Sequence, residues 1–230
     1  MALSGANAYL GTTAIQAGEL IVTSSNAIPT TSTTTVTSPG ILRISNSTQQ
    51  LNSLTGNGTV AFDSGSLILM PSVPTIFGGE ISGNGSLTKR GLGTMMLTGA
   101  STFVGTTNVE AGELQLQGTG SQFTDVQVRV DGTVRLSSPN ATITNLTVDS
   151  LGIAIVSSTG ATIDTLLVNG LTEIVGNGSR VRQATVGQNA ILRMQGSITA
   201  GPSSRINIDG GTIEFEVNEP FIDTPIVVAS

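Results

Sequence analysis

The carboxylates near the C-terminal end of the sequence are the side chains best suited to catalysis. Glu214 and Glu216 alternate with apolar residues along one run, and Glu219 and Asp223 follow shortly after it. A pair of carboxylates can cleave a glycosidic bond, one as general acid and the other as base or nucleophile. The alternative is that both glutamates simply point to solvent from a strand. We expect the alternative, because one Tyr and no Trp offer a sugar almost no aromatic platform.

A second set of oxygen-bearing side chains recurs at equivalent turns of the sequence, and it consists of Asp63, Asp131, Asp149, Asn169 and Asp209. If these residues stacked in register, their oxygens could bind calcium. The sequence does not contain the Gly-Gly-x-Gly-x-Asp pattern of calcium-loaded β-rolls. Asp and Asn at tight turns are also explained by hydrogen bonds between side chain and backbone. We therefore expect turn residues here, and no metal site, catalytic site or cofactor anywhere in the chain.

The residue types that are present exclude several other kinds of chemistry. The sequence has no His, Cys or Trp, so disulfides, thiol or imidazole catalysis and metal sites built from Cys or His cannot form. Nine basic and 15 acidic residues give a net charge of −6, and the only basic cluster is the pair Lys89 and Arg90. Nucleic acid and anionic membrane surfaces are therefore not expected partners. No apolar run reaches about 18 residues, so no membrane-spanning helix is expected.

Several short patterns indicate turns and loops. Gly-Asn-Gly at 56–58, 83–85 and 176–178 has no helix after it, which favours a turn over a phosphate-binding loop. Residues 23–40 and 70–79 are irregular and each contain two prolines, so they are expected either to protrude as recognition loops or to form inert bulges. Six Asn-x-Ser/Thr triplets are expected in surface loops, and they begin at Asn46, Asn57, Asn84, Asn140, Asn145 and Asn177.

The elements that must position these side chains follow from an internal repeat. "LSGANAYLGTTAIQAGELIV", residues 3–22, returns as "LTGASTFVGTTNVEAGELQL", residues 97–116, with ten identities in twenty. A looser unit of an apolar β-former, a turn and a second alternating run recurs about every 21 residues. Its apolar anchors are Ile15, Val36, Phe62, Leu87, Val109, Val130, Val148, Val168, Val186 and Ile208.

This pattern predicts an all-β, right-handed parallel β-helix, or solenoid, of about ten coils with roughly 21 residues each. Val, Ile and Thr with frequent Gly argue against helical repeats. Many short strands would also suit a β-sandwich or an antiparallel barrel. Those folds give no reason for a unit of this length to recur, whereas each coil of a solenoid can bury its apolar face only against its neighbours.

The amino-acid sequence of the repeat also resembles a known family. Residues 81–118, "ISGNGSLTKRGLGTMMLTGASTFVGTTNVEAGELQLQG", are similar to the passenger-associated transport repeat of bacterial autotransporters, and residues 3–22 resemble a second copy without its first part. The resemblance implies a secreted passenger, a right-handed parallel β-helix displayed on or released from a Gram-negative surface. Glu113 stands where the family usually has Thr.

We expect residues 1–230 to form a single β-helix domain, a fragment or assembly unit without signal peptide and membrane barrel. The expected function is that of a non-catalytic, adhesin-like structural segment, extracellular or on the bacterial cell surface. Its partners would be host or cell-surface molecules, or other copies of itself. The alternative is a fibre subunit that stacks end to end, because neither end shows a polar capping unit. A polysaccharide-acting enzyme is the third hypothesis.

Overall fold

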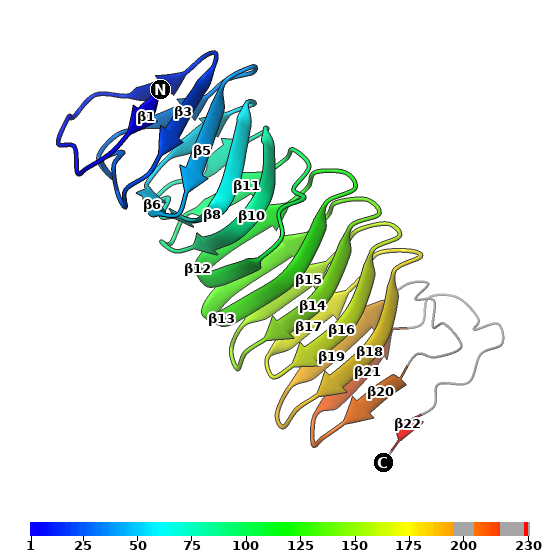
Figure 1. The fold of residues 1–230 in the computed structure, drawn as a ribbon. Helices are drawn as coiled ribbons and strands as arrows, with labels where there is room; N and C mark the ends of the chain where they lie inside the picture. The colour runs from blue at the N-terminus through cyan, green and yellow to red at the C-terminus, as the bar shows by residue number, and fades with distance from the viewer. Residues whose placement is uncertain (196–204, 217–227, 230) are drawn as a thin grey trace.

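The computed structural model describes residues 1–195, 205–216 and 228–229, and these form one continuous stack of parallel strands (Figure 1). About ten coils follow one another along the stack, and the described residues contain no helix. Consequently none of them offers a helical segment able to cross a membrane. Every pairing between strands is parallel, as between β14 (Thr142–Val148) and β16 (Thr162–Val168). The predicted parallel β-solenoid is therefore confirmed.

Each coil passes through three faces, which we call A, B and C in chain order. Face A contains β1 (Ala2–Leu3), β3 (Glu19–Val22), β5 (Ile41–Ser45) and the first parts of β8 (Thr59–Leu69), β10 (Glu80–Lys89), β13 (Gln122–Leu136), β14, β16 and β18 (Arg180–Val186). Face B contains β6 (Thr48–Leu51), later parts of β8, β10, β13, β14, β16 and β18, the first part of β12 (Thr106–Leu116), β20 (Arg205–Ile208) and β22 (Val228–Ala229). Face C contains β2 (Thr13–Ile15), β4 (Thr34–Val36), β7 (Leu54–Gly56), β9 (Thr75–Phe77), β11 (Thr94–Leu97), the ends of β12 and β13, β15 (Ile153–Val156), β17 (Leu171–Ile174), β19 (Ile191–Gln195) and β21 (Thr212–Glu216).

The core is a set of aliphatic columns inside the coil. Successive side chains of a strand point alternately into the coil and out to solvent. Every second residue is therefore buried and stacks on its counterpart in the next coil, about 4.8 Å away. On face B one column runs through Leu51, Leu69, Lys89, Val109, Val128, Val148, Val168, Val186 and Ile208. Partners in register are 18 residues apart at Ile41 and Thr59 and 22 residues apart at Glu19 and Ile41.

The predicted anchors form a single column only in the C-terminal half of the stack. Val148, Val168, Val186 and Ile208 do lie above one another, but Val130 is exposed and Val128 takes its place. In the N-terminal half the anchors belong to different faces, with Ile15 and Val36 on face C, Phe62 on face A and Leu87 on face B. The distances along the chain of 26 residues from Val36 to Phe62 and 25 from Phe62 to Leu87 exceed one coil because of this change of face, since each coil holds several equivalent apolar positions.

The two copies of the repeat lie on different faces. Ile15 in the first copy pairs with Val36 on face C, whereas its counterpart Val109 pairs with Val128 on face B. The closing strands are shifted in the same way, from face A for Glu19–Val22 to face C for residues 113–116. The same twenty residues thus occupy two placements that differ by one face. What the repeat encodes is a corner with its two flanking strands.

One residue shared by the two copies of the repeat is a glycine at its turn, and the backbone conformation explains why. Gly18 and Gly112, which are equivalent in the two copies, have φ angles of 71° and 65°. A side chain is strained in this left-handed region, so glycine is the residue that fits. The glycine that precedes "EL" in each copy is therefore required by the backbone.

The two irregular stretches are parts of the solenoid wall, and the prediction of protruding loops or bulges was wrong for them. In residues 23–40, Ala27 and Ile28 are fully buried, and Gln49 binds the backbone of Ile28 through both ends of its amide, at 3.0 Å and 2.8 Å. This side chain takes the place of a neighbouring strand. Residues 70–79 include β9, in which Phe77 is buried.

Candidate functional site

Of the four C-terminal carboxylates, the structure places only that of Glu214, and it does not bring it beside a second carboxylate of the described residues. Glu214 accepts a hydrogen bond of 2.8 Å from Nε of Arg193, and the same guanidinium binds Glu173 on the other side. Arg193 therefore joins three consecutive coils on the outside of face C. The side chain of Glu216 and the whole of Glu219 and Asp223 lie outside the described residues. The one candidate that the structure places is engaged in an ion pair between coils.

The turn residues Asp63, Asp131, Asp149, Asn169 and Asp209 do not stack in a single column. Asp63 lies at the corner between faces A and B, where it accepts a hydrogen bond from Ser45, whereas the other members lie at the corner between faces B and C. At that B–C corner Asp131 is in register with Ala111, away from the column that contains Asp149. Asp149 pairs with Arg129 at 3.0 Å. Among the described residues no three acidic side chains gather into a group that could hold a metal.

The B–C corner carries exposed charges and apolar side chains in four consecutive coils. The residues that follow the face B column are, coil by coil, Arg90, Glu110, Arg129 and Asp149. Nε of Arg90 lies 2.5 Å from Oε2 of Glu110, and Arg129 pairs with Asp149. The hydrogen bond to Glu110 raises the pKa of Arg90 above its ordinary value. Opposite charges thus alternate along this corner.

Apolar side chains project beside these charges. Leu92 is 87% exposed, Val130 45% and Leu151 78%, and each lies in the turn that leads from face B to face C. The intervening coil has the half-buried Ala111 at this turn, and its register partner in the next coil is Asp131, the residue after Val130. We call the four charged residues and these four apolar residues the B–C ridge. Sequence analysis did not find it, because its members are separated by about twenty residues and only the coil brings them together.

One lysine lies inside the solenoid. Lys89 is fully buried in the face B column, in register with Leu69 and Val109. Its Nζ donates hydrogen bonds to the carbonyl oxygens of Arg90 at 3.0 Å, Gly91 at 2.9 Å and Ala111 at 3.0 Å. Burial lowers the pKa of Lys89 to about 8. The signal in the sequence is a lysine at an apolar position of the alternation in "SLTK", and this lysine is treated in the sequence analysis only as half of a basic pair.

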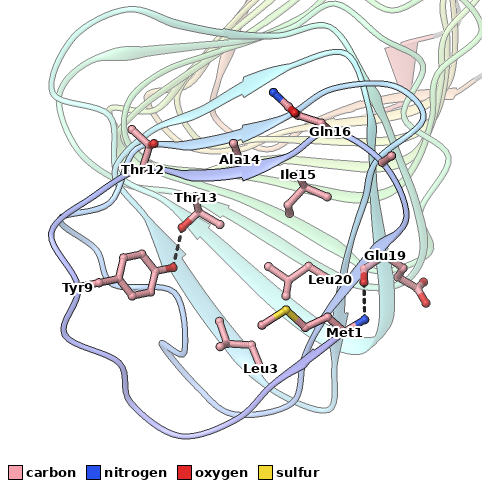
Figure 2. Close-up of a pocket in the computed structure, with 11 residues that line it drawn as sticks. Met1, Leu3, Tyr9, Thr12, Thr13, Ala14, Ile15, Gln16, Glu19 and Leu20 are labelled. Atoms are coloured by element: carbon pink, nitrogen blue, oxygen red, sulfur yellow. Dashed lines mark hydrogen bonds between the residues drawn. The ribbon is translucent and has the colours of Figure 1, made fainter.

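A hollow of about 370 Å³ opens at the N-terminal end of the stack (Figure 2). Its lining includes the buried core residue Ile15 and, beside it, Leu3 and Leu20, which pack against the core and are only partly covered. Tyr9 and Thr13 add hydroxyl groups that lie 2.6 Å apart. The one carboxylate in the lining, Glu19, pairs with Arg43 at 2.6 Å. The hollow offers apolar contact and hydroxyl groups, without a pair suited to acid–base catalysis.

The remaining motifs are structural parts of the coil. The three Gly-Asn-Gly segments lie at corners or in a strand bend, and Gly56, Gly83 and Gly178 have positive φ angles, as the turn interpretation requires. Of the six predicted surface asparagines, Asn84 and Asn145 lie within strands β10 and β14. Asn145 is half-buried and donates a hydrogen bond to Asp125 at 2.6 Å, so the loop prediction was wrong for it.

Residues 1–22 and 87–116 match the family described as passenger-associated-transport-repeat. Comparisons with curated proteins and with solved structures found no match. The chain is thus a parallel β-solenoid that contains this repeat at two places. The repeat and the fold together fit a segment of an autotransporter passenger, and the repeat family implies a secreted or surface-exposed segment.

Proposed function

We propose that this chain is a non-catalytic structural segment of a secreted or cell-surface passenger, and that it serves as an adhesin-like scaffold. The observation that carries the proposal is the embedding of the second repeat in an unbroken stack. Val109 and Leu114 are fully buried in it, and coils continue on both sides. A long rod of this kind holds exposed residues at fixed distances from a surface.

The charges support a structural role. Six of the eight arginines pair with an acidic residue of a neighbouring coil: Arg43, Arg90, Arg129, Arg135, Arg182 and Arg193. Catalytic carboxylates need a shifted pKa and room for substrate. Acidic residues held in pairs along the outside of the coils instead join one coil to the next.

Surface display tests the passenger function. The chain is fused between an export signal and the translocation unit of an autotransporter, and intact Gram-negative cells are labelled with an antibody against the chain. We expect labelling that protease added outside the cells removes. A chain that stays protected inside intact cells, while a known passenger in the same fusion is labelled, would contradict the proposal.

Binding to cells tests the adhesin-like role. Beads coated with the purified chain are incubated with host cells and with bacteria, and beads coated with heat-denatured chain serve as the control. We expect retention that depends on the folded chain. Equal retention of both kinds of beads would reject adhesion by the folded surface.

The hollow at the N-terminal end favours a second candidate, a fibre subunit that stacks end to end. Leu20 is partly exposed in the first repeat, whereas its counterpart Leu114 is fully buried by the preceding coil. An added coil would bury the interior of the first repeat in the same way. Negative-stain microscopy decides: rods much longer than one molecule support the fibre, and single short rods at every concentration exclude it.

A further inference from the structure

The B–C ridge gathers exposed aliphatic side chains at one corner of the solenoid, and Leu10, Val73, Ile76 and Val104 are exposed elsewhere on its surface. Leu92 and Leu151 are each more than three-quarters exposed. They lie three coils apart, which corresponds to about 14 Å at the spacing of stacked strands. Isolated exposed aliphatics are ordinary on protein surfaces, but a row with a matching pattern of charge indicates an interaction site.

The order of the charges indicates which partner fits. Along the ridge the signs are plus, minus, plus and minus, for Arg90, Glu110, Arg129 and Asp149. When this row is turned end for end, the signs become minus, plus, minus and plus. A second copy laid antiparallel therefore places an opposite charge against every charge of the first. A parallel copy in register would place each charge against its like.

We infer that the B–C ridge binds a second copy of this chain, with the two solenoids side by side and antiparallel about a two-fold axis. The axis passes between the coils of Glu110 and Arg129. Arg90 then faces Asp149 of the other copy, and Glu110 faces Arg129. Such an interface is isologous, so every contact occurs twice and the assembly closes as a dimer.

The apolar side chains fit the same axis. Leu92 of one copy faces Leu151 of the other, and the small Ala111 faces the turn that contains Val130 and Asp131. The exposed Leu92 and Leu151 are thus covered by each other's counterparts, while the acidic Asp131, in register with Ala111, lies between them. Asp131 is also exposed on this corner and lies outside the alternating row, opposite Ala111 of the other copy.

The size and chemistry of the ridge predict a weak and salt-sensitive dimer. A ridge four coils long buries less than the roughly 800 Å² per partner of a standard interface. Its ion pairs are exposed, and salt screens exposed pairs strongly. This inference goes beyond the proposed function, because a dimer forms or fails in solution whether or not the chain is displayed on a surface.

Sedimentation velocity of complementary variants tests the arrangement. One variant carries Arg90→Glu and Arg129→Glu, which makes the ridge wholly acidic, and the other carries Glu110→Arg and Asp149→Arg, which makes it wholly basic. We expect the wild type to shift from the 23.3 kDa monomer towards twice that mass as its concentration rises a hundredfold at low salt. The shift should be lost in each variant alone and return when the two variants are mixed. In about 1 M NaCl, where the Debye length is about 3 Å, it should be much smaller.

Two further variants separate the ridge from general effects. Arg182→Glu reverses an arginine at the A–B corner, outside the ridge, and should leave the dimer of the wild type intact. Leu92→Ser with Leu151→Ser keeps all charges and should abolish the dimer, and circular dichroism confirms the fold of each variant. A wild type that stays monomeric, a variant pair that fails to associate when mixed, or a dimer that survives both serine substitutions would overturn the inference.

Discussion

Lys89 is in register with Val109 inside the solenoid, so a charged side chain stacks directly on an aliphatic one. The ammonium group reaches out of the apolar column to three carbonyl oxygens at the B–C corner. A buried charge is tolerated only when hydrogen bonds replace its lost hydration. Lys89 therefore connects the core of the coil to the corner that carries the exposed ridge.

The burial of Lys89 predicts a specific dependence of stability on pH. Its pKa is about 8 in the folded chain and 10.5 in the unfolded chain, so between these values the unfolded chain binds more protons. Folding stability from this group should therefore be lowest and constant below pH 8, rise with pH from about 8 to about 10.5, and level off above that. Urea unfolding of the wild type and of Lys89→Met, measured at several pH values, isolates the effect. The rise should disappear in Lys89→Met, and an unchanged rise would assign it to other groups.

Gly83 should be among the glycines least tolerant of substitution. Its φ angle is +95°, and a Cβ atom built there would lie 2.1 Å from the carbonyl oxygen of Phe62 in the preceding coil. The rings of Phe62 and Phe103 meet across this coil with centroids 5.5 Å apart. Gly83→Ala should lower the free energy of unfolding by several times the cost of a left-handed backbone alone, which is about 1–2 kcal/mol. Gly120→Ala is the matched control, with φ +70° and open space around the position. Equal losses in the two variants would show that the clash is relieved at no cost.

A buried serine at the C–A corner should contribute a single, measurable hydrogen bond. Oγ of Ser158 donates to the carbonyl oxygen of Leu136 in the preceding coil at 3.0 Å, and Ser158 is 1% exposed. Ser158→Ala should lower the free energy of unfolding by about 1 kcal/mol, the net value of one hydrogen bond, because the carbonyl oxygen of Leu136 keeps the backbone N–H of Ser157 as a donor at 2.8 Å. Ser150→Ala, at an exposed position of a neighbouring turn, should stay within about 0.5 kcal/mol of the wild type. Thermal unfolding of the three proteins gives the comparison, and no difference between the variants would argue against the hydrogen bond.

Arg193 should stabilise the C-terminal coils in a manner that salt weakens. It binds Glu173 on one side and Glu214 on the other, so Arg193→Met leaves two carboxylates near each other without a cation. We expect a lower melting temperature at low salt and a smaller difference from the wild type at high salt. Arg180→Met is the control, because Arg180 makes no ion pair with the described residues. A loss that does not change with salt would mean that the aliphatic stem of Arg193, and not its charge, is responsible.

The solenoid could be predicted from the sequence because its cause is local and periodic. Alternation within each strand fixes which side chains point inward, and Val148, Val168 and Val186 recur at the spacing of one coil. The anchors of the N-terminal half were misassigned because Phe62 and Leu87 meet the same apolar rule on different faces. Periodicity distinguishes inside from outside, but it does not distinguish one face of a coil from another.

The features of the candidate sites were harder to predict, because they depend on register across coils. Asp149 and Asp131 are both turn acids in the sequence, yet only Asp149 joins the column of alternating charges, since Arg129 and Val130 together occupy the space of one residue in the preceding coil. The irregularity between Val109 and Ala111 cannot be inferred from residue types. Lys89 was missed for the opposite reason, because its neighbours predicted an apolar side chain.

The difference in placement between Ile15 and Val109 has a consequence for how such chains can change length. A crossover between the two copies during DNA replication would remove the 94 residues that separate these positions. It would join the remaining parts of the chain within the sequence that the two copies share. At about twenty residues a turn, 94 residues are not a whole number of turns. The shortened solenoid would remain apolar inside. The coils that follow the junction would be rotated about its long axis by roughly a third of a turn. Its outward-facing features would then point in a new direction.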